Sequence, residues 1–191
     1  MSRLSALAIV AAGLMFAPLA ASAQDTKEAP PLGTASFTPP ESKNQEPLTP
    51  EVFAVRAAVV NMNEIELSEL ALQKSGDAQL RQYASRVIED HKASQAKLKK
   101  IAANAQVALP GTVDTEHRDQ KTKLAEQTGS DFDRQYVQLM HAGHQEAEQL
   151  LESAAAAPEL APTFKSYARE TLDTVATHRD ETAKLMSQLD R

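Results

Sequence analysis

The sequence predicts an all-α protein: an antiparallel four-helix bundle with a short crossover helix between the second and third long helices. Three observations lead to this prediction. Apolar residues recur at steps of three and four over four long segments, glycine is scarce in residues 51–191, and strand-type alternation never extends over a useful length. The bundle is therefore expected to span residues 51–191, after two segments of a different kind.

The first of these segments, residues 1–23, is expected to be a secretory signal peptide. Arg3 gives it a positive start, an apolar run follows, and an Ala-Ser-Ala cleavage site ends at Ala23. The alternative is an uncleaved membrane anchor, because the apolar run is about long enough to span a bilayer. Pro18 and the cleavage site favour removal. We expect a periplasmic or secreted protein without a membrane span after cleavage.

The second segment, residues 24–50, is predicted to be a disordered linker. It holds six of the ten prolines and few apolar residues, so it cannot bury enough surface to fold. A tether of this kind would let the bundle reach a protein partner in the cell envelope.

Composition excludes several functions. The chain has no cysteine, which rules out thiolate catalysis, iron–sulfur clusters and cysteine zinc sites. Its formal charge of −6 becomes −7 when Arg3 is removed with the signal, so nucleic-acid binding is not expected. We find no Ser-His-Asp arrangement, phosphate-binding glycine loop or paired catalytic acids, so a non-enzymatic protein is the leading expectation. The alternative is catalysis at a bound metal ion with an open coordination position.

Capping signals divide the expected bundle into helices. Thr49 and Pro50 start a helix that runs to about residue 74, and Asp77 caps a second helix over residues 78–105. A crossover helix is expected over residues 115–127 and is closed by Gly129. Ser130 and Asp133 then form a capping-box-like start for the third long helix. The fourth follows Pro162 and continues to about residue 189.

Each long helix carries one polar, metal-capable residue on its apolar stripe: Glu64, His91, His144 and His178. Each buried polar group without a partner costs about 1–3 kcal/mol or more, so these four side chains need interaction partners in the core. One possible partner is a single divalent metal ion; imidazole and carboxylate are suitable ligands for zinc, iron, manganese or copper. The other possibility is a metal-free polar network, in which the four side chains bind one another and fix the register of the bundle.

Helix geometry allows the four residues to meet but does not require it. Residues can be counted outward from the turn that joins each pair of helices, near residue 75 for the first pair and near Pro158 for the second. On this count His91 lies about 6 Å farther along the bundle axis than Glu64, and His178 about 8 Å farther than His144. Asp90 and Glu148 are candidates to support the neighbouring histidines His91 and His144. Of the two further histidines, His141 is expected either to join the site or to face water, and His117 to be solvated in the crossover.

A set of motifs links the sequence to a known family. The motifs are FAVRAAVVNMNEIELSELAL (53–72), YASRVIEDH (83–91), Leu109-Pro110, GSDFDRQYVQLMHAGH (129–144) and the stretch 167–178. In these stretches the chain resembles the exported bacterial proteins grouped as domain of unknown function 4142. The resemblance implies a ferritin-like helical bundle and assigns no function; a stress-related role is one hypothesis.

The sequence departs from the di-iron proteins that share this kind of bundle. Di-iron sites use Glu-x-x-His on two helices, but Ile88 stands three residues before His91 and Val175 three before His178. A di-iron centre is therefore not expected. If a metal binds, a mononuclear site is the better prediction. The alternative function is a metal-free module for protein interaction in the envelope.

Overall fold

The computed structural model describes residues 47–189, and every structural statement below concerns this part of the chain. The predicted signal peptide and the predicted linker up to residue 46 lie outside it. Within the described range the protein is helical and contains no strand, which confirms the predicted all-α class. The helices are α1 (Pro50–Lys74), α2 (Ala78–Asn104), α3 (Thr115–Glu126), α4 (Gly129–Ala156) and α5 (Pro162–Leu189).

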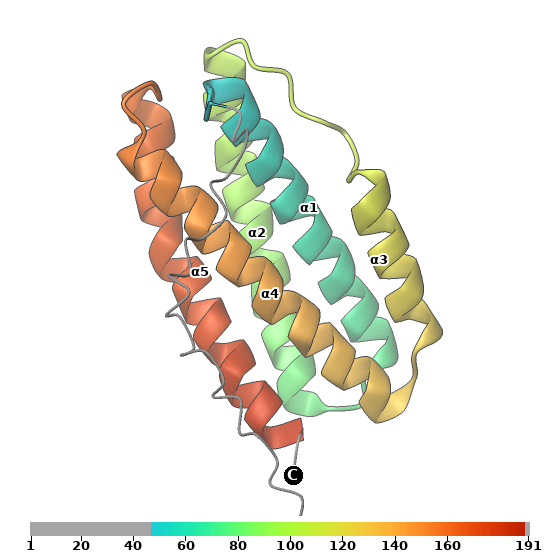
Figure 1. Ribbon diagram of the computed structural model, residues 1–191. Coiled ribbons are helices and arrows are strands. Elements are labelled where there is room, and N and C mark those ends of the chain that lie inside the picture. Colours follow the sequence, from blue (N-terminus) through green and yellow to red (C-terminus); the bar gives the residue numbers. More distant parts are fainter. Residues whose placement is uncertain (1–46, 190–191) are drawn as a thin grey trace, which may run out of the picture. The chain divides into compact units, whose positions relative to one another are not determined.

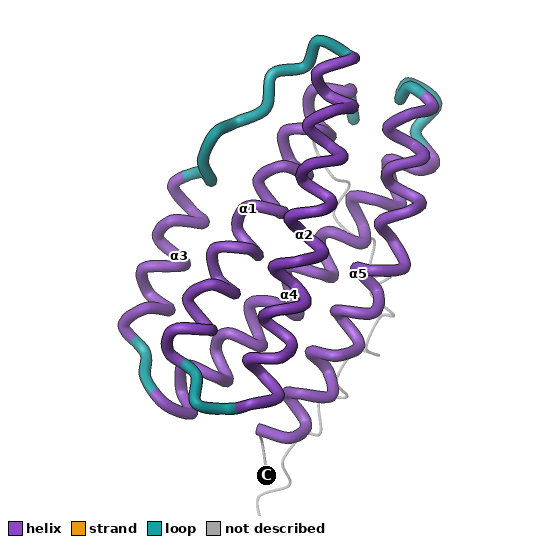
Figure 2. The backbone as a smooth tube through the Cα atoms, turned by 180° about the vertical axis from the view of Figure 1, so that it is seen from behind, coloured by secondary structure: helices purple, strands orange, loops and turns teal. Residues whose placement is uncertain are grey.

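The four long helices form an antiparallel bundle, in which each packs on two neighbours in the cyclic order α1, α2, α5, α4. α1 and α2 form one hairpin, and α4 and α5 form the other (Figures 1 and 2). Between the hairpins the chain runs back along the bundle through α3, so α4 starts at the same end as α2 (Figure 1). One long crossover of this kind is the connectivity of ferritin-like bundles.

The first two helices begin where the sequence predicted. The side chain of Thr49 accepts a hydrogen bond from the backbone N–H of Val52 at 3.2 Å, and Pro50 is the first helical residue. Asp77 accepts from the backbone N–H of Leu80 at 2.8 Å. Each cap satisfies a backbone donor that has no partner inside the helix.

The start of α4 differs from the predicted capping box. Its first residue is Gly129, which has a φ of 56°, and the preceding Thr128 makes no side-chain cap bond. Glycine adopts this backbone conformation without steric cost, so it lets the chain turn from the crossover into the helix. Asp133, predicted to belong to the box, is instead buried and 8% exposed.

The core consists of two apolar clusters. One contains Phe53 and Phe164 near the α4–α5 turn, and the other contains Leu67 and Phe132 near the α1–α2 turn. Along α1, Glu64 lies between a residue of the first cluster, Ala58, and Leu67 of the second. Each other long helix has its predicted polar residue in the corresponding place: His91 between Val87 and Leu98, His144 between Met140 and Ala147, and His178 between Val175 and Leu185. The bundle thus has a polar layer between two apolar ones.

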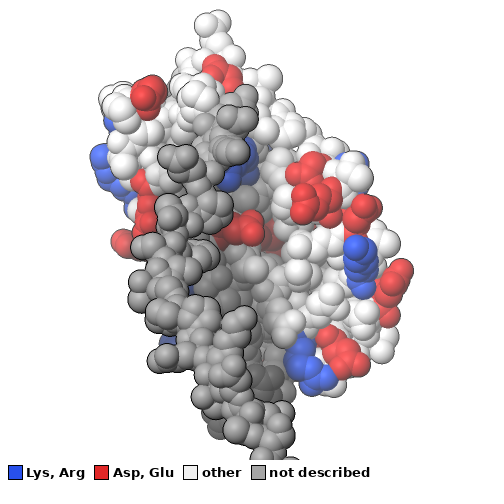
Figure 3. All heavy atoms as spheres, in the orientation of Figure 1, with Lys and Arg blue, Asp and Glu red and all other residues white. Residues whose placement is uncertain are grey.

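The surface is strongly polar. Figure 3 shows acidic and basic side chains close together along α3, and Lys121 of this helix forms a 2.8 Å ion pair with Glu66 of α1. Exposed pairs of this kind contribute at most about 1 kcal/mol each. None of the described helices combines the length and the hydropathy needed to cross a bilayer.

Candidate metal centre

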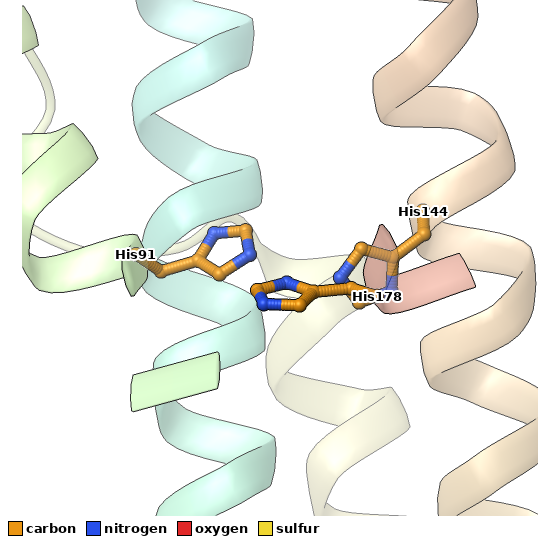
Figure 4. Close-up of side chains that lie close together, drawn as sticks. All are labelled: His91, His144 and His178. Atoms are coloured by element: carbon orange, nitrogen blue, oxygen red, sulfur yellow. The ribbon is translucent and has the colours of Figure 1, made fainter. Parts of the chain in front are cut away.

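The structure brings the four predicted residues together. They are almost fully buried: His144 is 0% exposed, Glu64 and His178 are each 2% exposed, and His91 is 4% exposed. One ring nitrogen from each histidine can be chosen so that all three lie within 4.8 Å of one another. Figure 4 shows the three rings extending toward a common point from α2, α4 and α5.

Glu64 completes the cluster from α1. Its Oε2 lies 2.8 Å from Nε2 of His91 and 3.5 Å from Nε2 of His144. Neither carboxylate oxygen has a hydrogen-bond partner of regular geometry among the described residues. The predicted offsets of about 6 and 8 Å along the bundle axis do not keep the four groups apart, because glutamate and histidine side chains are long enough to span them.

Each imidazole has an oxygen partner on its outward nitrogen. Nδ1 of His91 lies 3.0 Å from Oδ1 of Asn61, Nδ1 of His144 lies 2.6 Å from the carbonyl of Met140, and Nε2 of His178 lies 2.9 Å from Oδ2 of Asp90. These oxygens can only accept, so the outward nitrogen carries the hydrogen in a neutral ring. The inward nitrogens of His144 and His178 are therefore left with free lone pairs, whereas Nε2 of His91 lies 2.8 Å from the Glu64 carboxylate.

A hydrogen-bond network fixes the orientation of Asn61. Its Nδ2 donates to Oε1 of Gln95 and to the hydroxyl of Tyr167, both at 3.2 Å. The Tyr167 hydroxyl also lies 2.6 Å from Oγ of Ser94. Because both amide hydrogens are used, the amide oxygen of Asn61 must face His91 and hold that ring in place.

Burial and charge set the protonation of the cluster. Burial would raise the pKa of Glu64, but interactions with His144, His91 and His178 outweigh it and lower that pKa to about 2. Burial lowers the pKa of His144 and of His178, against a nearby carboxylate in each case. At neutral pH the cluster thus combines a carboxylate with neutral imidazoles at His144 and His178, the forms in which these side chains bind metals.

The supporting residues differ from those predicted. Asp90 bonds to His178 and not to its sequence neighbour His91, because adjacent residues on a helix point about 100° apart. Glu148, predicted to support His144, forms an ion pair with Arg179 instead.

The two peripheral histidines stay outside the cluster. His141 has Nδ1 2.9 Å from the hydroxyl of Thr182. His117, predicted to be solvated, is half-buried and lies 2.8 Å from Oδ1 of Asp114 at the start of α3.

Two residues of the site were missed by sequence reasoning. Asn61 stands three residues before Glu64 and so shares its helix face, which is the signal that could have found it. Gly143 lies beside the carboxylate: a Cβ at this position would approach Oε1 of Glu64 to 3.1 Å. A glycine inside a helix, next to a stripe histidine, was the available hint of close packing.

The fold and the cluster define a helical bundle with a buried histidine–carboxylate centre, and comparison with known proteins gives the family. The sequence profile of DUF4142, a domain of unknown function, matches residues 35–185. The chain belongs to this family. No curated protein matches the sequence significantly.

Solved structures share the fold at low sequence identity. A DUF305 fragment from Deinococcus radiodurans matches with a TM-score of 0.65 and 16% identity, over 75% of this chain and 99% of that one. A DUF305 protein from Streptomyces coelicolor, presumed to be secreted, gives 0.64 and 15%, over 74% and 94%. CopM in its Cu(II)-bound form gives 0.64 and 17%, over 75% and 99%.

Proposed function

We propose that this protein is an exported ferritin-like bundle that binds one divalent transition-metal ion through Glu64, His91, His144 and His178. The observation that carries the proposal is the state of the four donors. Each imidazole has its outward nitrogen on an oxygen acceptor, and the carboxylate oxygens have no regular hydrogen-bond partner among the described residues. A buried carboxylate in this setting requires a cation.

The spacing of the donors suits a metal ion. Nitrogen and oxygen ligands bind at about 2.0–2.2 Å, so neighbouring donors on a tetrahedral ion lie about 3.4 Å apart. Oε2 of Glu64 lies 2.8 Å and 3.5 Å from the facing nitrogens of His91 and His144. The three histidine donors lie within 4.8 Å of one another, so shifts of about 1 Å close the site. A single carboxylate favours a mononuclear site.

The donor set restricts the metal. Nitrogen and oxygen donors without sulfur suit Zn(II), Cu(II), Fe(II) or Mn(II), and Cu(II) binds most tightly to such sites in general. CopM, which shares the fold, was seen with Cu(II). At 17% identity this likeness shows the fold alone, so it only makes Cu(II) the first ion to test.

The metal-free alternative rests on the same cluster. A proton on His91 would give an ion pair with Glu64 across 2.8 Å and would leave His144 and His178 neutral. The two possibilities differ in their response to added metal. Export still rests on the predicted signal peptide, and a stress-related role or an envelope partner stays a prediction from the sequence.

Adding metal is expected to stabilise the mature protein, produced without a histidine tag. At a free concentration of about 100 times Kd, binding contributes about 2.7 kcal/mol and raises Tm by about 5–11 °C. Calorimetry with Cu(II), Zn(II), Fe(II) and Mn(II), together with metal analysis, measures the shift and a stoichiometry of one. The matched control, His141→Ala, removes a histidine outside the cluster and should keep the full shift. The absence of both bound metal and a Tm change would contradict the proposal.

Replacing Gly143 with alanine is expected to weaken metal binding without destabilising the metal-free bundle. Alanine in a helix is better than glycine by about 0.5–1 kcal/mol. Its Cβ would lie 3.1 Å from Oε1 of Glu64, so the carboxylate has to move by a few tenths of an ångström. Titration should show a Kd raised about 10-fold, as expected for a displaced ligand.

The control for this variant is Gly76→Ala, whose Cβ meets no atom within 4 Å. It should bind metal like the wild type. Wild-type affinity in Gly143→Ala would mean that the carboxylate is not a ligand or adjusts freely.

A further inference from the structure

We infer that metal ions reach the buried site through a depression between α2 and α5 beside His178. This inference rests on the proposed function and concerns the route to that site. The depression has a volume of about 290 Å³. Its lining residues are Arg86, Asp90, Asp173, Thr174, Thr177, His178 and Glu181.

His178 connects this depression with the cluster. The residue is 2% exposed, yet its Nε2 lies 2.9 Å from Oδ2 of Asp90, whose side chain is 44% exposed. Its Nδ1 is buried without a hydrogen-bond partner among the described residues. The same ring therefore has one nitrogen bonded to a partly exposed carboxylate and a free nitrogen in the core. Neither His91 nor His144 lines this depression.

The charge of the depression suits a cation. Arg86 forms a 2.9 Å ion pair with Glu181, which leaves Asp90 and Asp173 to give the surface a negative charge. Negative charge at the mouth of a site raises the local cation concentration and the rate of association. Carboxylate oxygens also bind divalent ions weakly enough to pass them on to imidazoles.

A second cavity at the cluster lacks these properties. It lies beside His91, has a volume of about 20 Å³ and holds no acidic or basic side chain among its lining residues apart from that histidine. Most of the lining is aliphatic. A desolvated divalent ion gains nothing there, because an uncompensated charge in apolar surroundings is costly. We therefore place uptake at the α2–α5 depression, with Asp90 and Asp173 receiving the ion and His178 swinging to admit it.

The test is the rate of Cu(II) uptake by the Asp173→Asn variant, measured by stopped flow at low salt. Asp173 is not a proposed ligand. Its removal should therefore raise the activation barrier for passage of the ion and leave the free energy of the metal-bound state unchanged. We expect uptake, and release to a chelator, to slow by the same factor of about 3–10 with Kd unchanged, and the difference should vanish at high salt. The matched control, Asp119→Asn, changes an exposed charge on α3 and should leave both rates at the wild-type value.

The outcomes separate the route from the site. If Cu(II) binds but Asp173→Asn takes it up and releases it at wild-type rates, the route is overturned and the metal site stands. A Kd that weakens because release is faster while uptake is unchanged overturns it as well, since Asp173 would then hold the bound ion. If the wild type binds no Cu(II) at equilibrium, the proposed function fails, and the route with it.

Discussion

Glu64→Gln is expected to abolish the metal-induced rise in Tm while leaving the metal-free bundle at least as stable as the wild type. The substitution keeps the shape of the side chain and removes its charge. Changes one shell away from a metal cost about 10- to 100-fold in affinity, so loss of the only anionic ligand should cost more than about 100-fold. At neutral pH, where His144 and His178 are uncharged and do not offset the burial of the carboxylate, the metal-free variant no longer has to bury a charge at a side chain that is 2% exposed.

The opposite signs of these two effects make the experiment decisive. Thermal unfolding and metal titration of the same preparation give both quantities. Glu66→Gln is the matched control, because Glu66 lies on the same helix and forms a surface ion pair with Lys121. Metal binding that survives in Glu64→Gln would remove this residue from the site. A large loss of metal-free stability would show instead that Glu64 pairs with a protonated histidine.

Acidification is expected to destabilise the metal-loaded protein much more steeply than the metal-free protein. Three imidazoles must stay unprotonated to hold the ion, whereas histidines in the unfolded chain take up protons below a pKa of about 6.5. Stability changes by about 1.36 kcal/mol per pH unit for each proton that the unfolded state binds in excess. The loaded protein should therefore lose up to about 4 kcal/mol per pH unit below that value.

The metal-free protein follows the same sign with a smaller slope. The pKa values of His144 and His178 are lowered by burial, so the stability they contribute is complete above about pH 6.5 and is lost as the pH falls through the lowered values. Once His144 and His178 are protonated, their charge helps to lower the pKa of Glu64 to about 2, so the carboxylate adds a further loss of stability as the pH falls below 4.5. Urea unfolding between pH 7.5 and 4.5, with and without metal, measures both slopes. Equal metal stabilisation at pH 7.5 and pH 5 would contradict a site made of imidazoles.

The helices and their caps could be predicted because the signals are local. The spacing of apolar residues places Phe53, Leu67 and Met140 in the core, and Thr49 and Asp77 mark helix starts by side-chain chemistry alone. The start of α4 could not be predicted in the same way. There a positive φ at Gly129 replaces a side-chain cap, and Asp133 turns into the core, which depends on how the crossover packs.

The candidate ligands could also be named from the sequence, since a polar residue on an apolar stripe points into the core wherever the stripe is buried. Their supporting residues could not. The sequence suggested Asp90 for His91 and Glu148 for His144, but Asp90 bonds to His178 and Glu148 pairs with Arg179. Such contacts depend on which helix is the neighbour and on the rotation of each helix about its axis.

The sequence by itself determined an all-α chain, four amphipathic helices, and one acid and three imidazoles directed at their common interior. These properties follow from side-chain periodicity along single helices. Only the tertiary structure decided that the four groups meet at one level, that an oxygen acceptor holds the outward nitrogen of each ring, and that His178 alone of the three faces an acidic depression. The physical reason is that donor distances and hydrogen-bond partners depend on the register and rotation of helices that are far apart in the chain.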